Sequence, residues 1–215
     1  MPVISDPGSD CRTGMSTGVL LLACLPAVAV GLLIRVWLMW TSLAALNADE
    51  GVTGLQAFDV LRGHFRLVVA GNDYGSTTET YLFAPFLAFW TGVWPLRILP
   101  VVLFAVAAYA LYRLARPILG RVPAAALALI GWTASGAMVL MSLHAYMGYT
   151  SGLIAQVVAL ASACHAMRAQ EKLGRTAFAG GFAAGFAVWS HPIFGTVALL
   201  GLIVPTLYRW RALRR

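Results

Sequence analysis

The sequence predicts an all-helical integral membrane protein with about six transmembrane helices and two further helices on the extracytoplasmic membrane surface. Hydrophobic residues make up 60% of the 215 residues and charged residues only 11%, whereas a soluble domain carries about a quarter charged residues. The apolar residues form long runs rather than the alternation of barrel strands, so helices are expected. The net charge of +7 comes from Lys and Arg between these runs, where membrane orientation explains them better than nucleic-acid binding.

The N-terminal part is expected to contain a disordered cytoplasmic tail over residues 1–16 and a first membrane span over residues 17–42. A cleaved signal peptide is the alternative, because the residues that end at Cys24 are similar to a lipoprotein cleavage box. The apolar run begins only at Val19 and continues past the cysteine, which favours an uncleaved helix. Arg35 lies near the far end of this span, and we expect its side chain to extend to the interface.

An acidic stretch, Asn47 to Tyr81, follows the first span and holds five of the eight carboxylates of the chain. These are Asp49, Glu50, Asp59, Asp73 and Glu79. Asn47 and Glu50 have capping-box spacing, which predicts a helix that begins here. Apolar residues recur along one face, as expected of a helix on a membrane surface, and Gly63 is expected to end it. The apolar stripe consists of Val52, Leu55, Phe58 and Leu61.

Residues 79–94 allow two interpretations. Residues 72–75 before them are expected to form a turn, and Ser76 and Glu79 again have capping-box spacing. The segment contains Pro85, and its length of about 16 residues is just under what crosses a bilayer. It is therefore either a membrane span or a second surface helix.

Basic or aromatic loops separate the remaining apolar runs. Spans are expected over residues 96–113, 122–141 and 150–167, followed by two short runs, 176–189 and 193–208, hinged at His191 and Pro192. The membrane module then covers residues 17–209, its first outer loop covers residues 43–95, and residues 210–215 form a basic cytoplasmic end.

The distribution of Lys and Arg sets the expected orientation. With six spans and a cytoplasmic N-terminus, eleven basic residues fall inside and three, Arg62, Arg66 and Arg97, fall outside. A seven-span chain with its N-terminus outside gives twelve inside and two outside, so charge alone does not decide. The short length of segment 79–94 and its central proline favour six spans.

Asp49 and Glu50 are the candidate catalytic residues, because they lie where the first span leaves the membrane. A carboxylate there suits general-base work on a hydroxyl group, and partial desolvation raises the pKa of a carboxylate toward the useful range. The alternative is that two acids in a first helical turn only stabilise the helix dipole.

Candidate residues for binding a donor phosphate or another part of a substrate lie in the outer loops. Arg97 and Arg62 suit phosphate because the planar guanidinium matches its oxygens, although snorkelling to lipid headgroups is the alternative. The other candidates are Tyr74, Glu79, His144, Tyr149 and His191. For these the alternatives are an interfacial aromatic belt, a helix cap for Glu79 and a helix break for His191.

Several function classes lack support in the sequence. The three cysteines show no metal-ligand or disulfide spacing, and there is no glycine-rich nucleotide loop or serine elbow. A transporter is disfavoured because the expected spans carry no charged residue besides Arg35 and no inverted repeat is visible.

The runs DEGVTGLQAFDVLRGHF, YGSTTETYLFAPFLAFW and PLRILP carry a resemblance to a known family. They resemble the N-terminal half of bacterial type C glycosyltransferases, the class that includes protein O-mannosyltransferases and lipid A aminoarabinose transferases (family 39-like). The pieces Gly148–Tyr149 and Trp189–Pro192 are similar as well, and the likeness covers residues 17 to 209.

The resemblance implies transfer of a sugar from a polyprenyl-phosphate carrier to a glycan, lipid or protein acceptor, outside the bacterial plasma membrane. It implies that Asp49 is the base with Glu50 beside it, that Arg97 lies near the donor phosphate or the base, and that segment 79–94 is a surface helix. Both termini would then be cytoplasmic. The cofactor stays open: a divalent metal is compatible with the resemblance, but no ligand set is visible.

Two departures from the family favour an alternative. The second outer loop, LHAYMGYTSG, lacks the acid that many members carry there, and family members are usually longer. The alternative is a non-catalytic, half-length relative that binds the lipid carrier or serves as a scaffold, completed by a second subunit or a missing C-terminal part.

Overall fold

The computed structural model describes residues 16–71, 74–133, 135–168 and 173–213, and it confirms the all-helical prediction for them. In chain order the elements are α1 (Thr17–Met39), the short 3-10 helix η1 (Ser42–Ala44), α2 (Ala48–Leu61), α3 (Thr78–Phe89), α4 (Pro95–Leu119), α5 (Arg121–Thr133), α6 (Gly136–Met141), α7 (Tyr149–Arg168), α8 (Leu173–Ser190) and α9 (Pro192–Leu213). The N-terminal tail up to residue 15, Asp73 of the expected turn and residues 214–215 lie outside the described residues.

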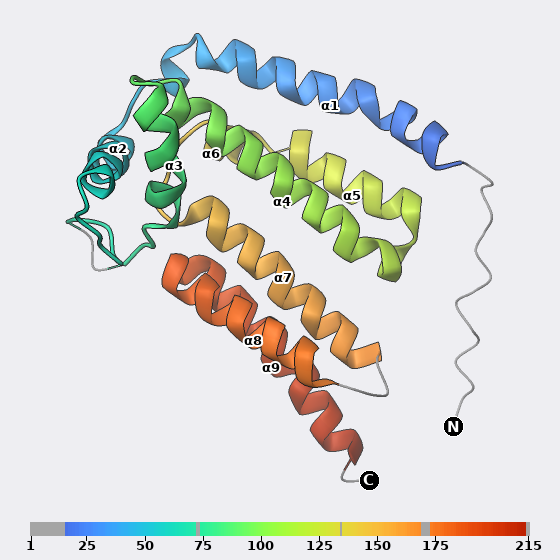
Figure 1. The fold of residues 1–215 in the computed structure, drawn as a ribbon. Helices are drawn as coiled ribbons and strands as arrows, with labels where there is room; N and C mark the ends of the chain where they lie inside the picture. Colours follow the sequence, from blue (N-terminus) through green and yellow to red (C-terminus); the bar gives the residue numbers. More distant parts are fainter. Residues whose placement is uncertain (1–15, 72–73, 134, 169–172, 214–215) are drawn as a thin grey trace.

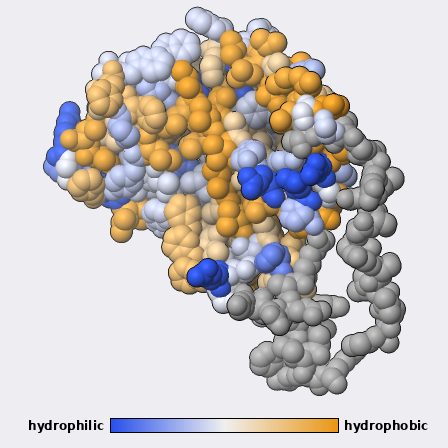
Figure 2. Space-filling model, turned by 45° about the vertical axis from the view of Figure 1, so that its right-hand side comes forward, coloured by the Kyte–Doolittle hydropathy of each residue, from blue (hydrophilic) through white to orange (hydrophobic). Residues whose placement is uncertain are grey.

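Three helices are long and apolar enough to cross a membrane, which is typical of a membrane protein. They are α1, α4 and α7, and α9 contributes a shorter apolar stretch, Pro192–Val204. Figure 2 shows hydrophobic residues over much of one face, with hydrophilic residues gathered in separate groups. Such a surface suits lipid as its solvent.

The long helices lie side by side, and α2 and α3 cover one end of them (Figure 1). α7 packs against α4, α8 and α9, while α5 packs against both α1 and α4. Three connections meet at this end: the one from α1 to α4, which contains α2 and α3, the loop from α6 to α7, and the junction of α8 and α9. We call this end the acidic end. The last turns of α4 and α7 and the first turn of α8 lie at the opposite end, which we call the basic end.

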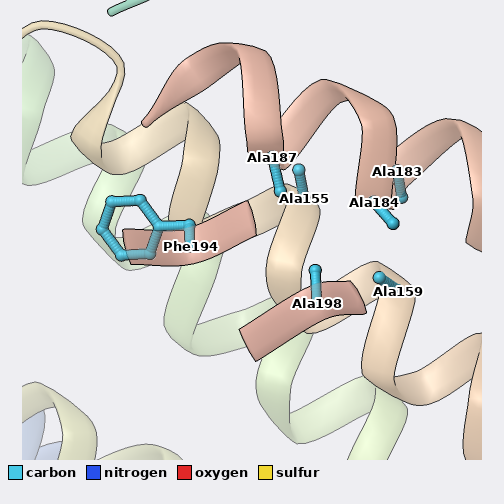
Figure 3. Close-up of a cluster of buried hydrophobic side chains, with 7 residues drawn as sticks. All are labelled: Ala155, Ala159, Ala183, Ala184, Ala187, Phe194 and Ala198. Atoms are coloured by element: carbon cyan, nitrogen blue, oxygen red, sulfur yellow. The ribbon is translucent and has the colours of Figure 1, made fainter. Parts of the chain in front are cut away.

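The α7–α8–α9 unit packs through small side chains (Figure 3). Its buried cluster consists of Ala155, Ala159, Ala183, Ala184, Ala187, Phe194 and Ala198. Small residues let helix backbones approach closely, which is how membrane helices associate where lipid offers no hydrophobic driving force. At Gly195 an added Cβ would lie 2.5 Å from the Cα of Val188, so glycine is required there.

Arg35 of α1 is fully buried, so the expectation that its side chain extends to the interface is wrong. Its Nε donates to Ser142 Oγ at 2.7 Å, Nη1 donates to the Gly31 carbonyl at 2.9 Å, and Nη2 donates to the Trp132 carbonyl at 3.1 Å. The guanidinium also lies 3.8 Å from the centre of a Trp132 ring. These acceptors and the aromatic face replace water, and the cation thereby ties α1 to α5 and to the end of α6.

Two expected element boundaries change. The expected span over residues 122–141 is two helices, α5 and α6, and Ser135 caps α6 by accepting from the amide of Met138 at 3.4 Å. The segment after Ser76 begins at the N-cap Thr77 without a side-chain cap, so the expected capping box with Glu79 is wrong. α3 ends at Phe89, and its 12 residues span only about 18 Å, against a hydrocarbon core of about 30 Å.

The capping box of Asn47 and Glu50 is confirmed, and α2 ends at Leu61 with Arg62 as its C-cap, directly before Gly63, which has a φ of 85°. Of the apolar stripe of α2, Leu55 and Leu61 are 69% and 45% exposed. Val52 and Phe58 are half-buried, and Phe58 packs against the core. The face of α2 that packs against the protein also carries Thr53, Gln56 and Ala57. The two exposed leucines suit a helix at a membrane surface.

Candidate functional site

The adjacent acids Asp49 and Glu50 lie in different surroundings. Asp49 is exposed, whereas Glu50 has no exposed surface. The Glu50 carboxylate accepts from both Nη atoms of Arg97, from the amide of Ala145 at 2.9 Å and from the amide of Asn47 at 3.2 Å. Glu50 therefore joins the start of α2, the start of α4 and the loop between α6 and α7.

Arg97 is only 3% exposed, and its donors are used inside the protein. Besides Glu50, it donates to the carbonyl of Leu143 at 3.0 Å and to the carbonyl of Ala44 at 2.7 Å. The planar fork that suits a phosphate suits the Glu50 carboxylate equally well. The expected role of Arg97 as a phosphate ligand does not fit this placement.

The charge state of Glu50 follows from its partners. Burial raises the pKa of this carboxyl, but the hydrogen bonds from Arg97, Ala145 and His144 outweigh burial and leave its pKa below the usual value. A general base needs a raised pKa and access to a substrate, and Glu50 has neither. Its position is that of a structural anchor, which corrects its expected catalytic role.

Glu79 is a second internal anchor. It is 2% exposed, and its two oxygens accept from the amides of Gly148 and Ser151, each at 2.9 Å. These amides belong to the N-terminal end of α7, where a helix dipole favours negative charge. Burial nevertheless raises the pKa of Glu79, against the lowering effect of those hydrogen bonds. Glu79 thus fastens α7 instead of capping its own helix or binding a substrate.

His144 lies inside the same anchor. Its Nδ1 is 3.1 Å from Glu50 Oε2, and its Nε2 is 3.1 Å from the carbonyl oxygen of Leu43. The ring is only 7% exposed. Contrary to the expectation from the sequence, His144 is therefore not open to a substrate.

The segment between these anchors forms one wall of a pocket at the acidic end. Glu50 holds it at Ala145, and Glu79 holds it at Gly148 and Ser151. Gly148 has a φ of 69°, and a Cβ added to it would lie 2.2 Å from the carbonyl oxygen of Ser190. The same oxygen accepts from the amide of Ser76 at 3.1 Å. Three segments far apart in the sequence therefore meet at this point.

The pocket has a volume of about 60 Å³ and is lined by Asp49, Tyr74, Gly75, Tyr146, Met147, Tyr149 and His191. The ring centres of Tyr74 and His191 are 5.1 Å apart, and those of Tyr149 and His191 are 4.6 Å apart. The structure therefore brings together four of the residues singled out in the sequence: Asp49, Tyr74, Tyr149 and His191.

The pocket combines one carboxylate with neutral polar rings. Burial lowers the pKa of His191, which keeps the imidazole uncharged near neutral pH. Burial and the charges of Glu50 and Asp49 raise the pKa of Tyr146, so this phenol stays protonated. Such a site can accept a proton from a hydroxyl group and can pack aromatic faces against a ring. No lysine or arginine is among the described residues that line it.

The remaining candidate, Arg62, and the nearby basic residues His64 and Arg66 lie elsewhere. Arg62, His64 and Arg66 are exposed and do not line the pocket. Arg62 lies 3.8 Å from Asp59 on the surface of α2. The expected substrate role of Arg62 therefore does not fit the pocket.

Sequence reasoning missed the contributions of Met147 and Gly75 to the pocket and the structural need for Gly148. A glycine directly before an N-terminal helical turn is the signal that could have indicated Gly148.

A divalent metal does not fit the described residues, because no group of three or more His, Cys, Asp or Glu side chains among them could hold an ion. Comparisons with protein-family models, with curated proteins and with solved structures found no match.

Proposed function

We propose that this chain is a membrane glycosyltransferase that moves a sugar from a polyprenyl-phosphate carrier to an acceptor on the extracytoplasmic side. The observation that carries the proposal is the pocket at the acidic end, where Asp49 is an exposed carboxylate beside Tyr74, Tyr149 and His191. A carboxylate flanked by aromatic rings suits proton transfer from a sugar-accepting hydroxyl, and the rings suit packing against a sugar.

In the proposed reaction, Asp49 accepts the proton of the acceptor hydroxyl. The hydroxyl oxygen forms a bond to the anomeric carbon of the sugar, and the bond from that carbon to the carrier phosphate breaks. Polyprenyl phosphate leaves with the bonding electrons. Glu50 and Glu79 contribute by holding the wall that carries Tyr146 and Tyr149, since both bind backbone amides beside these residues.

The proposed membrane arrangement has six spans: α1, α4, α5 together with α6, α7, α8 and α9. α2 and α3 are proposed to lie on the outer surface. The meeting of three connections at the acidic end and the shortness of α3 support this arrangement. Both termini are then cytoplasmic, and the Asp49 pocket is extracytoplasmic.

A second candidate function is a non-catalytic relative that binds the lipid carrier. The volume of the pocket favours it, because about 60 Å³ is far below the roughly 300–1,000 Å³ of typical small-molecule sites. Sugar transfer therefore requires the pocket wall to move when substrate binds, whereas a chain that carries out no chemistry in this pocket needs no such movement.

The deciding experiment measures sugar transfer in membranes that contain the full chain, with a radiolabelled polyprenyl-phosphate sugar and the endogenous acceptors. We expect Asp49→Asn to reduce transfer about 100-fold or more at unchanged protein level, because a general base contributes about 10²–10⁴ in rate. Asp59→Asn, an acid of the same helix outside the pocket, is the matched control and should retain activity.

Full activity of the Asp49→Asn variant would overturn the proposal. If the unchanged chain transfers no sugar from any donor yet retains labelled polyprenyl phosphate, the second candidate function replaces it.

A further inference from the structure

A larger cavity lies at the basic end of the molecule, away from the Asp49 pocket. It has a volume of about 370 Å³ and lies between α4, α7 and α8. α7 packs against both other helices. Each helix contributes polar side chains to the lining: Arg113 from α4, Ser162 and His165 from α7, and Arg175 and Thr176 from α8.

The described residues that line this cavity include two arginines and no carboxylate. Arg113 and Arg175 are exposed at its rim, and Arg113 donates to the hydroxyl of Tyr109 at 2.9 Å, a neutral partner that leaves its charge uncompensated. The sequence carries no carboxylate over residues 109–121, 158–168 or 173–180. Glu171 lies outside the described residues. A negatively charged group is the complementary ligand, and the guanidinium groups favour phosphate oxygens.

Polar side chains from three different helices line this one cavity, which distinguishes it from an ordinary excess of positive charge on one side of a membrane. Arginines that only orient a chain need not share a cavity. Here cationic or hydrogen-bonding side chains from three helices, two of them long enough to span a membrane, line the same space.

The cavity adjoins an apolar groove. The groove has a volume of about 210 Å³, lies between α4, α5 and α7, and shares Leu114, Ile118 and Ala161 with the lining of the cavity. A cationic cavity beside an apolar groove matches a molecule that joins an anionic headgroup to a hydrocarbon chain. Free phosphate shares the headgroup chemistry but has nothing to place in the groove.

We propose that the cavity between α4, α7 and α8 binds the phosphate headgroup of an anionic phospholipid, with one acyl chain along the adjoining groove. Arg113 and Arg175 bind the phosphate, and Ser162, His165 and Thr176 supply further hydrogen bonds. This site is separate from the Asp49 pocket, so it does not depend on the proposed glycosyltransferase function.

The test uses the purified full chain in a neutral detergent. Binding of phosphatidylglycerol and of phosphatidylcholine is measured by native mass spectrometry, with and without excess inorganic phosphate. We expect phosphatidylglycerol to bind in preference to phosphatidylcholine and inorganic phosphate not to displace it. The double variant R113Q/R175Q should bind phosphatidylglycerol about 25-fold more weakly, because each basic residue near an anionic lipid contributes about 1 kcal/mol, or about fivefold.

The matched control is R62Q/R66Q, which removes two exposed arginines from the acidic end. It should bind phosphatidylglycerol as the unchanged chain does, and both double variants should elute as the same folded species. Three results would each overturn the proposal: equal binding of both lipids, unchanged affinity of R113Q/R175Q, or displacement of phosphatidylglycerol by inorganic phosphate.

Discussion

Replacing Arg97 by methionine is expected to destabilise the protein strongly. Methionine removes both donors to Glu50 and the donors to the Leu143 and Ala44 carbonyls, yet Glu50 stays fully buried. Breaking a buried ion pair by removing one partner costs about 3–5 kcal/mol, because a charge is left buried without compensation. For a chain of this size each kcal/mol corresponds to about 2–4 °C in Tm. The expected loss is therefore about 10 °C.

The measurement is the Tm of the full chain in detergent, followed by size-exclusion chromatography after heating. Arg62→Met is the matched control, because Arg62 forms a solvent-exposed contact of 3.8 Å with Asp59. Surface pairs contribute about 0–1 kcal/mol, so this variant should lose less than about 4 °C.

A double variant tests whether the unpaired buried charge causes the loss of stability. Arg97→Met combined with Glu50→Gln removes both charges and should be more stable than Arg97→Met alone, since no buried charge is left. If Arg97→Met has the same Tm as the unchanged chain and loses only sugar transfer, Arg97 is a substrate ligand. That result would refute the structural role assigned to the Arg97–Glu50 pair.

Two further predictions concern the wall of the Asp49 pocket. Gly148→Ala should lower stability by at least about 1–3 kcal/mol, because alanine is strained at a φ of 69° and its Cβ would meet the Ser190 carbonyl. Gly185→Ala is the matched control, because a Cβ added at Gly185 meets open space, and this variant should leave Tm unchanged or raised. Equal Tm values for the two variants would contradict the close approach of Gly148 to the Ser190 carbonyl. Glu79 has a folded pKa above its usual 4.5, so the stability that its protonation contributes is greatest below pH 4.5 and is lost as the pH rises through the folded pKa. Glu79→Gln should therefore reduce any rise in Tm between pH 7.5 and pH 5, and an identical pH dependence of both proteins would show that Glu79 does not titrate there.

Local signals in the sequence were sufficient for the two ends of α2 and for the class of fold. The Asn47–Glu50 capping box and the end of α2 before Gly63 depend on neighbouring residues, and both are confirmed. Composition and long apolar runs identify a helical chain with helices long enough to cross a membrane.

The directions of the polar side chains could not be predicted, because distant partners decide them. Glu79 has the spacing of a cap, yet it binds amides 69 and 72 residues further along the chain. Asp49 and Glu50 are neighbours, and the contacts of Glu50 with Arg97 and Ala145 fix which of them faces inward. The capping pattern of Asn47 and Glu50 therefore identified the start of α2, but it did not indicate that Glu50 also binds Arg97 and Ala145. The roles of Asp49, Tyr74, Tyr149 and His191 in catalysis stay predictions.

The spread of the pocket residues along the chain has a consequence for biogenesis. Asp49 precedes His191 by 142 positions. At a synthesis rate of about 5–20 residues per second, the two residues leave the ribosome roughly 7–30 s apart. During that interval the pocket beside Asp49 lacks His191, and Glu50 lacks first Arg97 and then Ala145. The pocket can thus close only after α8 has been made, and a chain released before that point carries the acidic stretch without its site.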